Sequence, residues 1–158
     1  MYIDLLRCTF WNSTCMKIKS VKTLKDYELL IVALRKARKE NDFQYEDYSF
    51  CMGYHWWLVI DCGDLAGFAG LNTKEKIAEL SIAVVFPKYR GRHFHRKLIK
   101  KRIKKAKEEG FSTVWAWTLN TNLVSIGNLK AMGFKKSKGG KGWRNDARKD
   151  LIYWEKTI

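Results

Sequence analysis

The spacing of apolar and polar residues changes from block to block along the chain, and each spacing predicts a different element. Residues 16–21 alternate with a period of two, which predicts a strand. Thr23 and Asp26 have the spacing of a capping box, and a helical period follows them to about residue 40. The residues that recur at this helical spacing are Leu24, Tyr27, Leu30, Ile31, Leu34 and Arg38.

Three apolar runs with short turns between them follow in the middle of the chain. Glycine, aspartate and asparagine in the turns predict tight connections, so the runs predict an antiparallel meander. The expected strands are residues 56–61, 65–71 and 77–86. Because side chains alternate along a strand, Glu79 is expected to share a face with Ser81, Ala83 and Val85.

A basic amphipathic helix is predicted over about residues 93–109, and an apolar strand over residues 113–118 follows it. A strand–helix–strand step of this length predicts a parallel crossover. The expected buried stripe of the helix is Phe94, Leu98, Ile99, Ile103 and Ala106. Its expected outer face carries Arg96, Lys97, Lys100, Lys101, Arg102, Lys104, Lys105 and Lys107. A short helix at 124–131 and strands at 134–137 and 151–155 complete one domain over residues 16–158, preceded by an extension of residues 1–15.

The formal net charge of +15 over 158 residues is a larger surplus of cations than a mixed surface carries. Such a surface suits nucleic acid, an anionic membrane face or a ligand with phosphate groups. The alternative is a solvated, lysine-rich surface that has no anionic partner.

Cysteine spacing and hydropathy indicate which structural frameworks and which cellular location to expect. Cys8, Cys15, Cys51 and Cys62 form no C-x-x-C pair and have no histidine cluster beside them, so neither a metal nor a disulfide framework is expected. No apolar run reaches the roughly 20 residues of a spanning helix, and the first residues lack the pattern of a signal peptide. The sequence therefore predicts a soluble cytoplasmic protein with no membrane partner. It leaves the oligomeric state open, a dimer included.

The strand that ends near Val85 leads into a basic turn and then into the long helix, an arrangement that suits an anion. Unpaired backbone N–H groups and the positive end of the helix dipole favour negative charge at a helix N-terminus. Arg90 and Arg92 flank Gly91 in the turn and can add charge. The turn is therefore predicted to hold a phosphate group.

Two blocks of sequence resemble the GNAT N-acetyltransferase family. Residues 85–92, Val-Phe-Pro-Lys-Tyr-Arg-Gly-Arg, resemble the family's strand end and pyrophosphate loop, often summarised as Arg-x-x-Gly-x-Gly/Ala. Residues 122–134 resemble its second block, with an asparagine, a small residue three positions later and a closing Gly-Phe. The resemblance extends over residues 16–156. It implies an α/β (α+β) fold with a mixed, mostly antiparallel sheet of about six or seven strands, flanking helices and a splayed parallel strand pair at a cleft for coenzyme A.

The family resemblance implies that acetyl-CoA, or another acyl-CoA, donates an acyl group directly to a primary amine. It places the pantetheine arm against Val84 and Val85, with Asn122 and Asn128 nearby. Either asparagine could instead cap a turn or the short helix. The residues that match the pyrophosphate loop are Arg90, Gly91, Arg92, His93, Phe94 and His95.

The sequence departs from the family pattern at three positions. His93 and His95 stand where glycines usually allow the backbone to approach the phosphates closely. Leu129 stands where many members have a tyrosine that protonates the leaving thiolate. An acid for that step must therefore come from another residue or from water. The candidate residues are Tyr54, Tyr89 and Tyr153.

Glu79 and His55 are the candidate catalytic residues. Glu79 lies on the strand before the loop, about where several family members have a general base, and a carboxylate beside an amine cleft can accept its proton. His55 precedes the first strand of the meander, and imidazole has a suitable intrinsic pKa. The alternatives are a solvated glutamate at the start of a strand and a structural histidine at a strand edge.

Lys141, Trp143 and Arg144 lie in a basic, glycine-rich segment where an aromatic ring could stack on a nucleobase. The same tryptophan could instead be tucked into a loop without a ligand. Two functions therefore stay open. One is an acyl-CoA-dependent N-acyltransferase whose amine acceptor is carried on an anionic macromolecule such as nucleic acid. The other is a catalytically degenerate GNAT-like protein that binds nucleic acid or a host protein through its basic surface.

Overall fold

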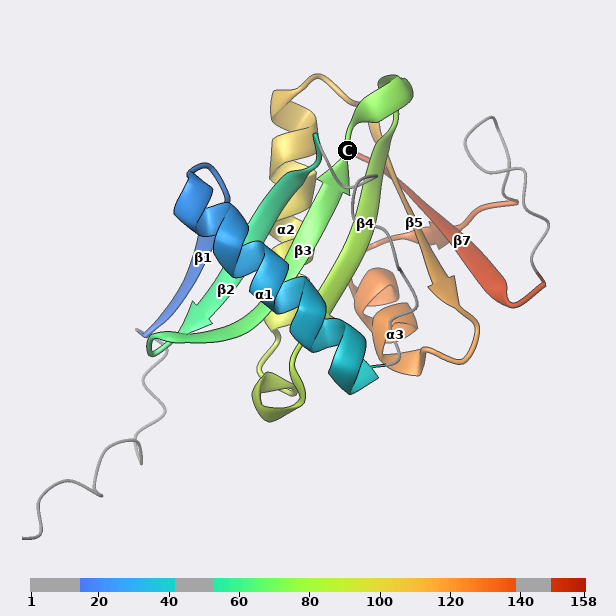
Figure 1. Ribbon diagram of the computed structural model, residues 1–158. Helices are drawn as coiled ribbons and strands as arrows, with labels where there is room; N and C mark the ends of the chain where they lie inside the picture. The colour runs from blue at the N-terminus through green and yellow to red at the C-terminus, as the bar shows by residue number, and fades with distance from the viewer. Residues whose placement is uncertain (1–14, 42–52, 139–148) are drawn as a thin grey trace, which may run out of the picture.

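The computed structural model describes residues 15–41, 53–138 and 149–158, and in this part of the chain seven strands form one mixed sheet (Figure 1). Their order is β1-β2-β3-β4-β5-β7-β6, and only the β4–β5 pair is parallel among the described strands. The strands are β1 Met16–Ser20, β2 His55–Asp61, β3 Asp64–Asn72, β4 Ala78–Val85, β5 Thr113–Leu119, β6 Lys135–Lys136 and β7 Leu151–Thr157. The predicted sheet, with its antiparallel meander and parallel crossover, is confirmed. The predicted extension lies almost wholly outside the described residues.

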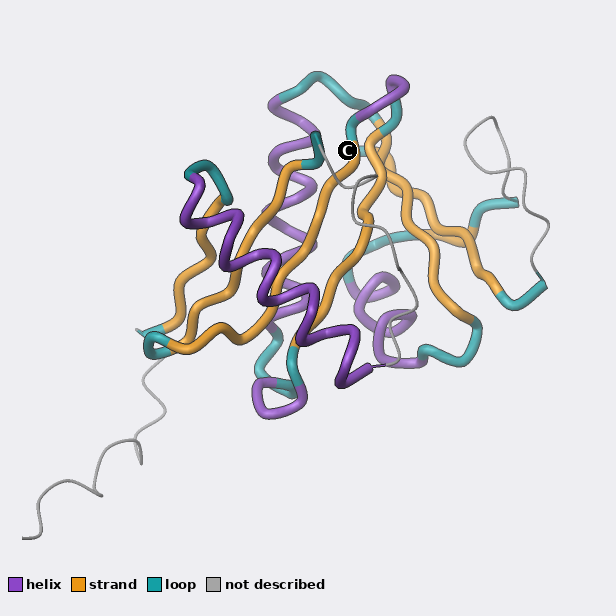
Figure 2. Tube along the Cα trace, in the orientation of Figure 1, coloured by secondary structure: helices purple, strands orange, loops and turns teal. Residues whose placement is uncertain are grey.

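Helices cover both faces of the sheet (Figures 1 and 2). Helix α1, Leu24–Asn41, crosses one face, and helix α2, Phe94–Glu108, packs on the other. Helix α3, Leu123–Ala131, follows β5, and short 3-10 turns occupy Lys74–Lys76 (η2) and Pro87–Tyr89 (η3). The core lies between the sheet and these helices and contains the fully buried side chains of Leu58, Phe68, Leu98, Ile99 and Val114. None of the helices in the described ranges is long and apolar enough to cross a bilayer.

Helix α1 begins with the predicted capping box, but it buries only part of the predicted stripe, Leu30 and Leu34. The Asp26 N–H donates to Thr23 Oγ1 at 3.3 Å, and the Thr23 N–H donates to Asp26 Oδ2 at 3.1 Å. Leu24, Tyr27 and Ile31 are exposed, so their expected place on the inner face is wrong. The buried apolar residues are Leu30, Ala33, Leu34 and Ala37. The two alanines lack long side chains, so the helix backbone can approach the sheet closely.

A bulge interrupts the ladder between β3 and β4. Ala69 pairs with Ala83, but Leu71 pairs with Leu80, so one extra residue is accommodated on β4 between these pairs. The bulge reverses the side-chain alternation beyond it. Glu79 therefore shares a face with Val84, and the predicted grouping of Glu79 with Val85 is wrong.

Arg102 fills the space beneath this bulge, although the helical pattern predicted it on the outer face of α2. Its side chain is fully buried, with 1% of its surface exposed. Its Nη1 donates to the carbonyl oxygens of Ser81 at 3.0 Å and Gly70 at 3.3 Å, and its Nε donates to Leu98 O at 3.3 Å. Gly70 and Ser81 are the residues at which the ladder slips, so the guanidinium satisfies carbonyl groups that the bulge takes out of the sheet. Burial lowers the pKa of Arg102 to about 9.

Arg102→Ala is expected to lower the free energy of unfolding by about 2–4 kcal/mol, because it leaves a cavity and two buried carbonyl groups without donors. Urea unfolding followed by circular dichroism measures this change. Lys101→Ala, at the exposed neighbouring position on α2, is the matched control and should stay within about 0.5 kcal/mol of the parent. Equal effects of the two substitutions would contradict the bulge-filling role.

Candidate functional site

The parallel strands β4 and β5 pair at their first residues only and then separate. Ala78 pairs with Val114 and Glu79 pairs with Trp115, after which no further pair joins the two described strands. The half-buried residues 81–83 of β4 follow directly, at the bulge. The separation therefore opens between the two strands just beyond Glu79, and backbone groups of β4 that a ladder would use face this opening.

Glu79 is positioned at the point where the strands separate. Its side chain is 5% exposed, and Trp117 Nε1 donates to Oε1 at 2.8 Å. Trp117 lies directly opposite Tyr153 in the β5–β7 ladder, so the three side chains project from the same face of the sheet. This is the face that α1 crosses, although α1 lies over β1–β4 rather than over β5 and β7 (Figure 1).

The segment that joins β4 to α2 presents the start of α2 without a side-chain cap. Gly91 and His93 have left-handed backbones, with φ of 78° and 58°. His93 is the N-cap residue, but its side chain makes no capping hydrogen bond, and the first turn of α2 contains no acidic residue. The backbone N–H groups of this turn and the positive end of the helix dipole are therefore available to an anion.

Two aspartates of the β2–β3 hairpin turn hold this segment from outside. The Asp61 carboxylate accepts hydrogen bonds from both terminal nitrogens of Arg92, with Nη2 at 3.0 Å from Oδ1. Asp64 Oδ2 accepts a hydrogen bond from the Tyr89 hydroxyl at 2.9 Å. The Arg92 guanidinium also lies over the ring of Phe94, 4.8 Å from its centroid. These contacts of Arg92 therefore fix the position of the loop.

His95 turns away from the loop towards α3. Its Nδ1 lies 3.1 Å from Asn128 Nδ2, and Arg96 Nε donates to Asn128 Oδ1 at 2.9 Å. Burial, and then the charge of Arg102, lower the pKa of His95 to about 4. A neutral ring whose Nδ1 accepts from the Asn128 amide agrees with this direction. The His95 side chain therefore forms part of the contact between α2 and α3.

A hollow of about 580 Å³ lies beside the loop, between the start of α2 and the end of α3. Its α2 wall is basic and its α3 wall is small and apolar. The lining residues are His93, Arg96, Lys97, Lys100, Ala131, Met132 and Gly133. The loop, the hollow and the opening between β4 and β5 can together hold an extended ligand with phosphate groups at one end.

The model of the acetyltransferase (GNAT) family matches residues 24–134, which is more than half of the chain. The chain belongs to this family. The family prediction made from the two sequence blocks is therefore confirmed. No curated protein sequence matches the chain.

Solved structures agree with the GNAT fold. The ribosomal-protein-S18-alanine N-acetyltransferase of Escherichia coli superposes with a TM-score of 0.71 and 21% identity, over 90% of this chain and 94% of that chain. The structure of yncA of Salmonella typhimurium, solved with its cofactor acetyl-CoA, superposes with a TM-score of 0.67 and 21% identity, over 91% of this chain and 94% of that chain. For the PaiA N-acetyltransferase of Thermoplasma acidophilum, solved with coenzyme A, the TM-score is 0.68 and the identity 17%, over 90% of this chain and 99% of that chain. At these identities the likeness establishes the fold.

The GNAT architecture brings some of the predicted site residues together and leaves others apart. Glu79 lies where β4 and β5 separate, and the loop follows the other end of β4, where Arg90 Nε donates to the carbonyl of Val85 at 3.1 Å. Val84 is buried in the core opposite Phe68. Lys141, Trp143 and Arg144 lie outside the described residues.

His55 lies at the far end of the molecule from the loop. It starts β2, and its Nε2 contacts Glu109 Oε1 at 2.6 Å, just beyond the last turn of α2. Since α2 has 15 residues, about 22 Å of helix separates this pair from the loop. The geometry agrees with the structural alternative for His55.

Asn122 and Leu129 also have structural contacts. Asn122 Oδ1 accepts the N–H of Ser125 at 3.1 Å, so it caps α3, as the second interpretation of this residue expected. Leu129 is 4% exposed and packs in the core. Of the candidate replacement acids, Tyr89 donates to Asp64 and Tyr54 stacks on Trp56 with centroids 5.9 Å apart. Tyr153 lies opposite Trp117, the side chain that donates to Glu79.

Sequence reasoning missed Trp117, Arg102 and the two loop-holding aspartates. Asp61 and Asp64 lie 31 and 25 residues before their partners Arg92 and Tyr89, and no local pattern links them. The short spacing of the aspartates across a two-residue hairpin turn was the one available signal. The described residues contain no group of three or more side chains suited to a metal.

His95 gives the protein a testable dependence on pH. Its pKa is about 4 when folded and about 6.5 when unfolded, so the unfolded chain binds the proton first as the pH falls. The free energy of unfolding should therefore fall by up to about 3 kcal/mol between pH 7 and pH 4. Urea titrations across this range measure it, and His95→Gln should give a shallower decline. An identical slope in the two proteins would contradict a buried, neutral His95.

Proposed function

We propose that this GNAT protein transfers an acetyl or related acyl group from acetyl-CoA, or another acyl-CoA, to a primary amine. The observation that carries the proposal is the separation of β4 from β5 directly beside a loop that leads into an uncapped helix N-terminus. Two structures with the same fold were solved with acetyl-CoA or coenzyme A. Both facts favour an acyl-CoA as the donor.

The residues around the opening fit such a donor. Backbone N–H groups at the start of α2 would bind the pyrophosphate, and Arg90 would add charge at its edge. The basic hollow with Arg96, Lys97 and Lys100 would hold the remaining phosphate-bearing part of the molecule. His93 and His95 do not oppose this fit, because His95 points to Asn128 and His93 is exposed. The pantetheine arm would follow the free edge of β4.

Glu79 is placed to act as the general base. The amine must lose a proton to attack the thioester carbonyl, and the Glu79 carboxylate, aimed by Trp117, would accept it directly or through one water. Attack forms the C–N bond, and collapse of the tetrahedral species breaks the C–S bond. A backbone N–H group of β4 beside the bulge would stabilise the oxyanion during this step.

The departing thiolate requires little help from the protein. Leu129 is apolar and cannot donate a proton, but a thiol has a pKa of about 8.5, so water can protonate the leaving group. Tyr153 is the tyrosine whose position beside Trp117 would allow it to assist. The proton taken by Glu79 returns to solvent when the products leave.

The acceptor amine would be carried on an anionic macromolecule such as nucleic acid. The formal net charge of +15 supports this part of the proposal. Trp117 and Tyr153 line the approach to Glu79 on the face of β5 and β7, where an unpaired base or an aromatic acceptor could pack. Lys141, Trp143 and Arg144 stay predicted contacts for this carrier.

Isothermal titration with acetyl-CoA should give saturable binding by the purified protein. Arg90→Ala should weaken it by about 10- to 100-fold, because one charge-assisted hydrogen bond contributes roughly 1.5–3 kcal/mol. Arg35→Ala, an exposed substitution of the same type on α1, should leave the affinity unchanged. Absence of heat at millimolar acetyl-CoA would contradict the donor and favour the alternative function, a degenerate GNAT-like protein that binds partners through its basic surface.

Glu79→Gln should lower kcat by about 10²–10⁴ and leave the affinity for acetyl-CoA unchanged, because it removes the base but keeps the shape. Release of the coenzyme A thiol with a panel of primary amines, including aminoacylated RNA, gives the rate. Glu28→Gln, an exposed substitution on α1, is the matched control. A Glu79→Gln rate equal to that of the control would remove Glu79 from the chemistry.

A further inference from the structure

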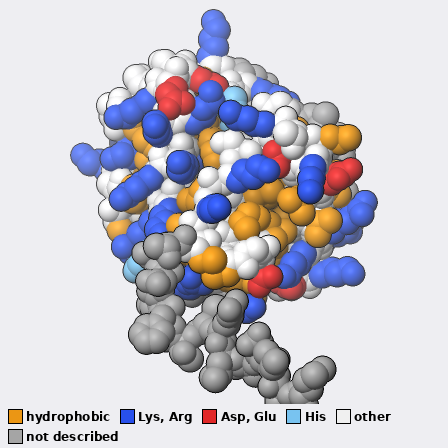
Figure 3. All heavy atoms as spheres, turned by 90° about the vertical axis from the view of Figure 1, so that its left-hand side faces the viewer, with side chains coloured by type: hydrophobic (Ala, Val, Ile, Leu, Met, Phe, Trp, Pro, Cys, Tyr) orange, Lys and Arg blue, Asp and Glu red, His pale blue; other side chains and the backbone are white. Residues whose placement is uncertain are grey.

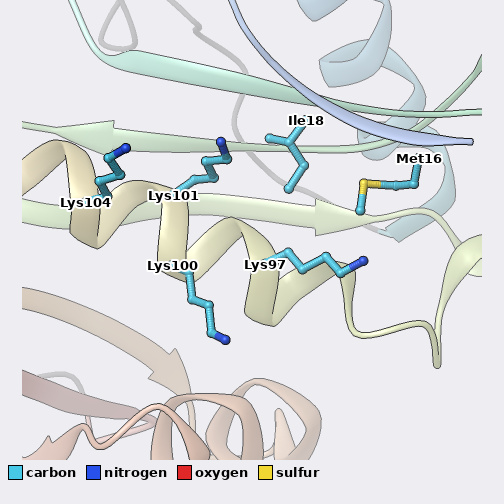
Figure 4. A pocket seen from close by; sticks show the side chains of 6 residues that line it. All are labelled: Met16, Ile18, Lys97, Lys100, Lys101 and Lys104. Atoms are coloured by element: carbon cyan, nitrogen blue, oxygen red, sulfur yellow. The ribbon is translucent and has the colours of Figure 1, made fainter. Parts of the chain in front are cut away.

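A second concave surface lies on the side of α2 that faces the edge strand β1. It is a groove of about 440 Å³ whose floor is formed by two half-buried apolar side chains of β1, Met16 and Ile18. Lysines of α2 form its wall. The complete lining is Met16, Ile18, Lys97, Lys100, Lys101 and Lys104 (Figure 4).

The lysines follow one another along the helix. Lys101 and Lys104 extend on the side of Ile18, Lys97 extends towards Met16, and Lys100 points to the opposite side of the helix (Figure 4). Among the described residues, Lys104 is the one lysine of the four within 4.0 Å of a carboxylate, at 3.9 Å from Glu108. Both partners of that pair are well exposed, at 76% and 53%, so the pair neutralises little charge.

The charge continues beyond the groove. The face of the molecule that includes the edge strand β1 carries many lysine and arginine side chains and fewer acidic ones, with hydrophobic side chains between them (Figure 3). From Lys97 to Lys104 the helix rises about 10 Å. The positive wall is therefore long enough to follow a short stretch of sugar–phosphate backbone.

The shape of the groove favours a strand over a flat anionic surface. Met16 and Ile18 are half-buried, whereas the four lysines beside them are exposed. A bilayer would require apolar side chains that project beyond the cations in order to insert. An unpaired base can instead enter the groove and contact its apolar floor while lysines bind the phosphates.

We propose that the groove between α2 and β1 binds the sugar–phosphate backbone of a single-stranded nucleic acid. The inference builds on the proposed anionic carrier, but it does not depend on acyl transfer. The groove lies along the length of α2, whereas the proposed donor site lies at the N-terminus of that helix. Lys97 and Lys100 line both the groove and the basic hollow. Lys101 and Lys104 line the groove but not the hollow. Substitution of the second pair therefore separates the two sites.

The test is fluorescence anisotropy with a labelled 20-nucleotide oligouridylate, over a series of salt concentrations and without acetyl-CoA. Lys101→Gln combined with Lys104→Gln should weaken binding about tenfold and reduce the slope of log K against log salt by about 1.4, or 0.7 for each lost phosphate contact. Glutamine keeps the helix propensity of lysine, so the fold should persist, as circular dichroism can check. Acetyl-CoA binding by the double variant, measured by calorimetry, should equal that of the parent.

The matched control is Lys25→Gln combined with Lys39→Gln, which removes the same charge from exposed positions of α1 on the other side of the sheet. It should change the affinity for the oligonucleotide less than about twofold. Equal losses in the two double variants would overturn the groove, because binding would then follow net charge alone. No binding by the parent, or groove-dependent binding to phosphatidylserine vesicles in place of RNA, would also overturn it. Since the RNA assay contains no acetyl-CoA, failure of the donor proposal leaves this result unaffected.

Discussion

The buried guanidinium of Arg102 is the interaction on which the shape of the site depends. It donates to the carbonyls of Gly70 and Ser81, the two residues where the β3–β4 ladder slips. A bulge leaves backbone groups without ladder partners, and buried groups of this kind are costly unless a donor reaches them. Arg102 supplies that donor from α2. The bulge can therefore persist inside the core, and β4 can depart from β5 immediately after Glu79.

The opening has two fixed borders as a consequence. Trp117 holds Glu79 at the point where the strands diverge, and the hairpin aspartates hold Arg92 and Tyr89 at the other end of β4. The loop is thus set by groups outside the ligand site, so its backbone N–H groups need no rearrangement to receive an anion. His95 completes the support on the inner side through Asn128. Both borders are therefore formed by contacts within the described chain.

Local patterns predicted the order of the elements, because hydrophobic period, caps and turn residues act over a few positions. The capping box at Thr23 and the hairpin turn after Asp61 are such features. The failures have a common cause in long-range contact. Arg102 is polar by composition and could be assigned only to the surface, although a carbonyl pair 21 and 32 residues away requires it inside. The residues around Ser81 likewise carry no sequence pattern that indicates a bulge. The predicted alternation of side chains from Glu79 to Val85 was therefore wrong.

We propose that the bulge and the loop form one binding site for the acyl donor. The most direct measurement is the change in backbone amide NMR shifts of nitrogen-15-labelled protein when acetyl-CoA is added. Large changes are expected at residues 91–94 and 81–83, with His55 and Glu109 at the far end of α2 unaffected. Changes that leave both the loop and the bulge unaffected, at a concentration that saturates binding, would contradict it.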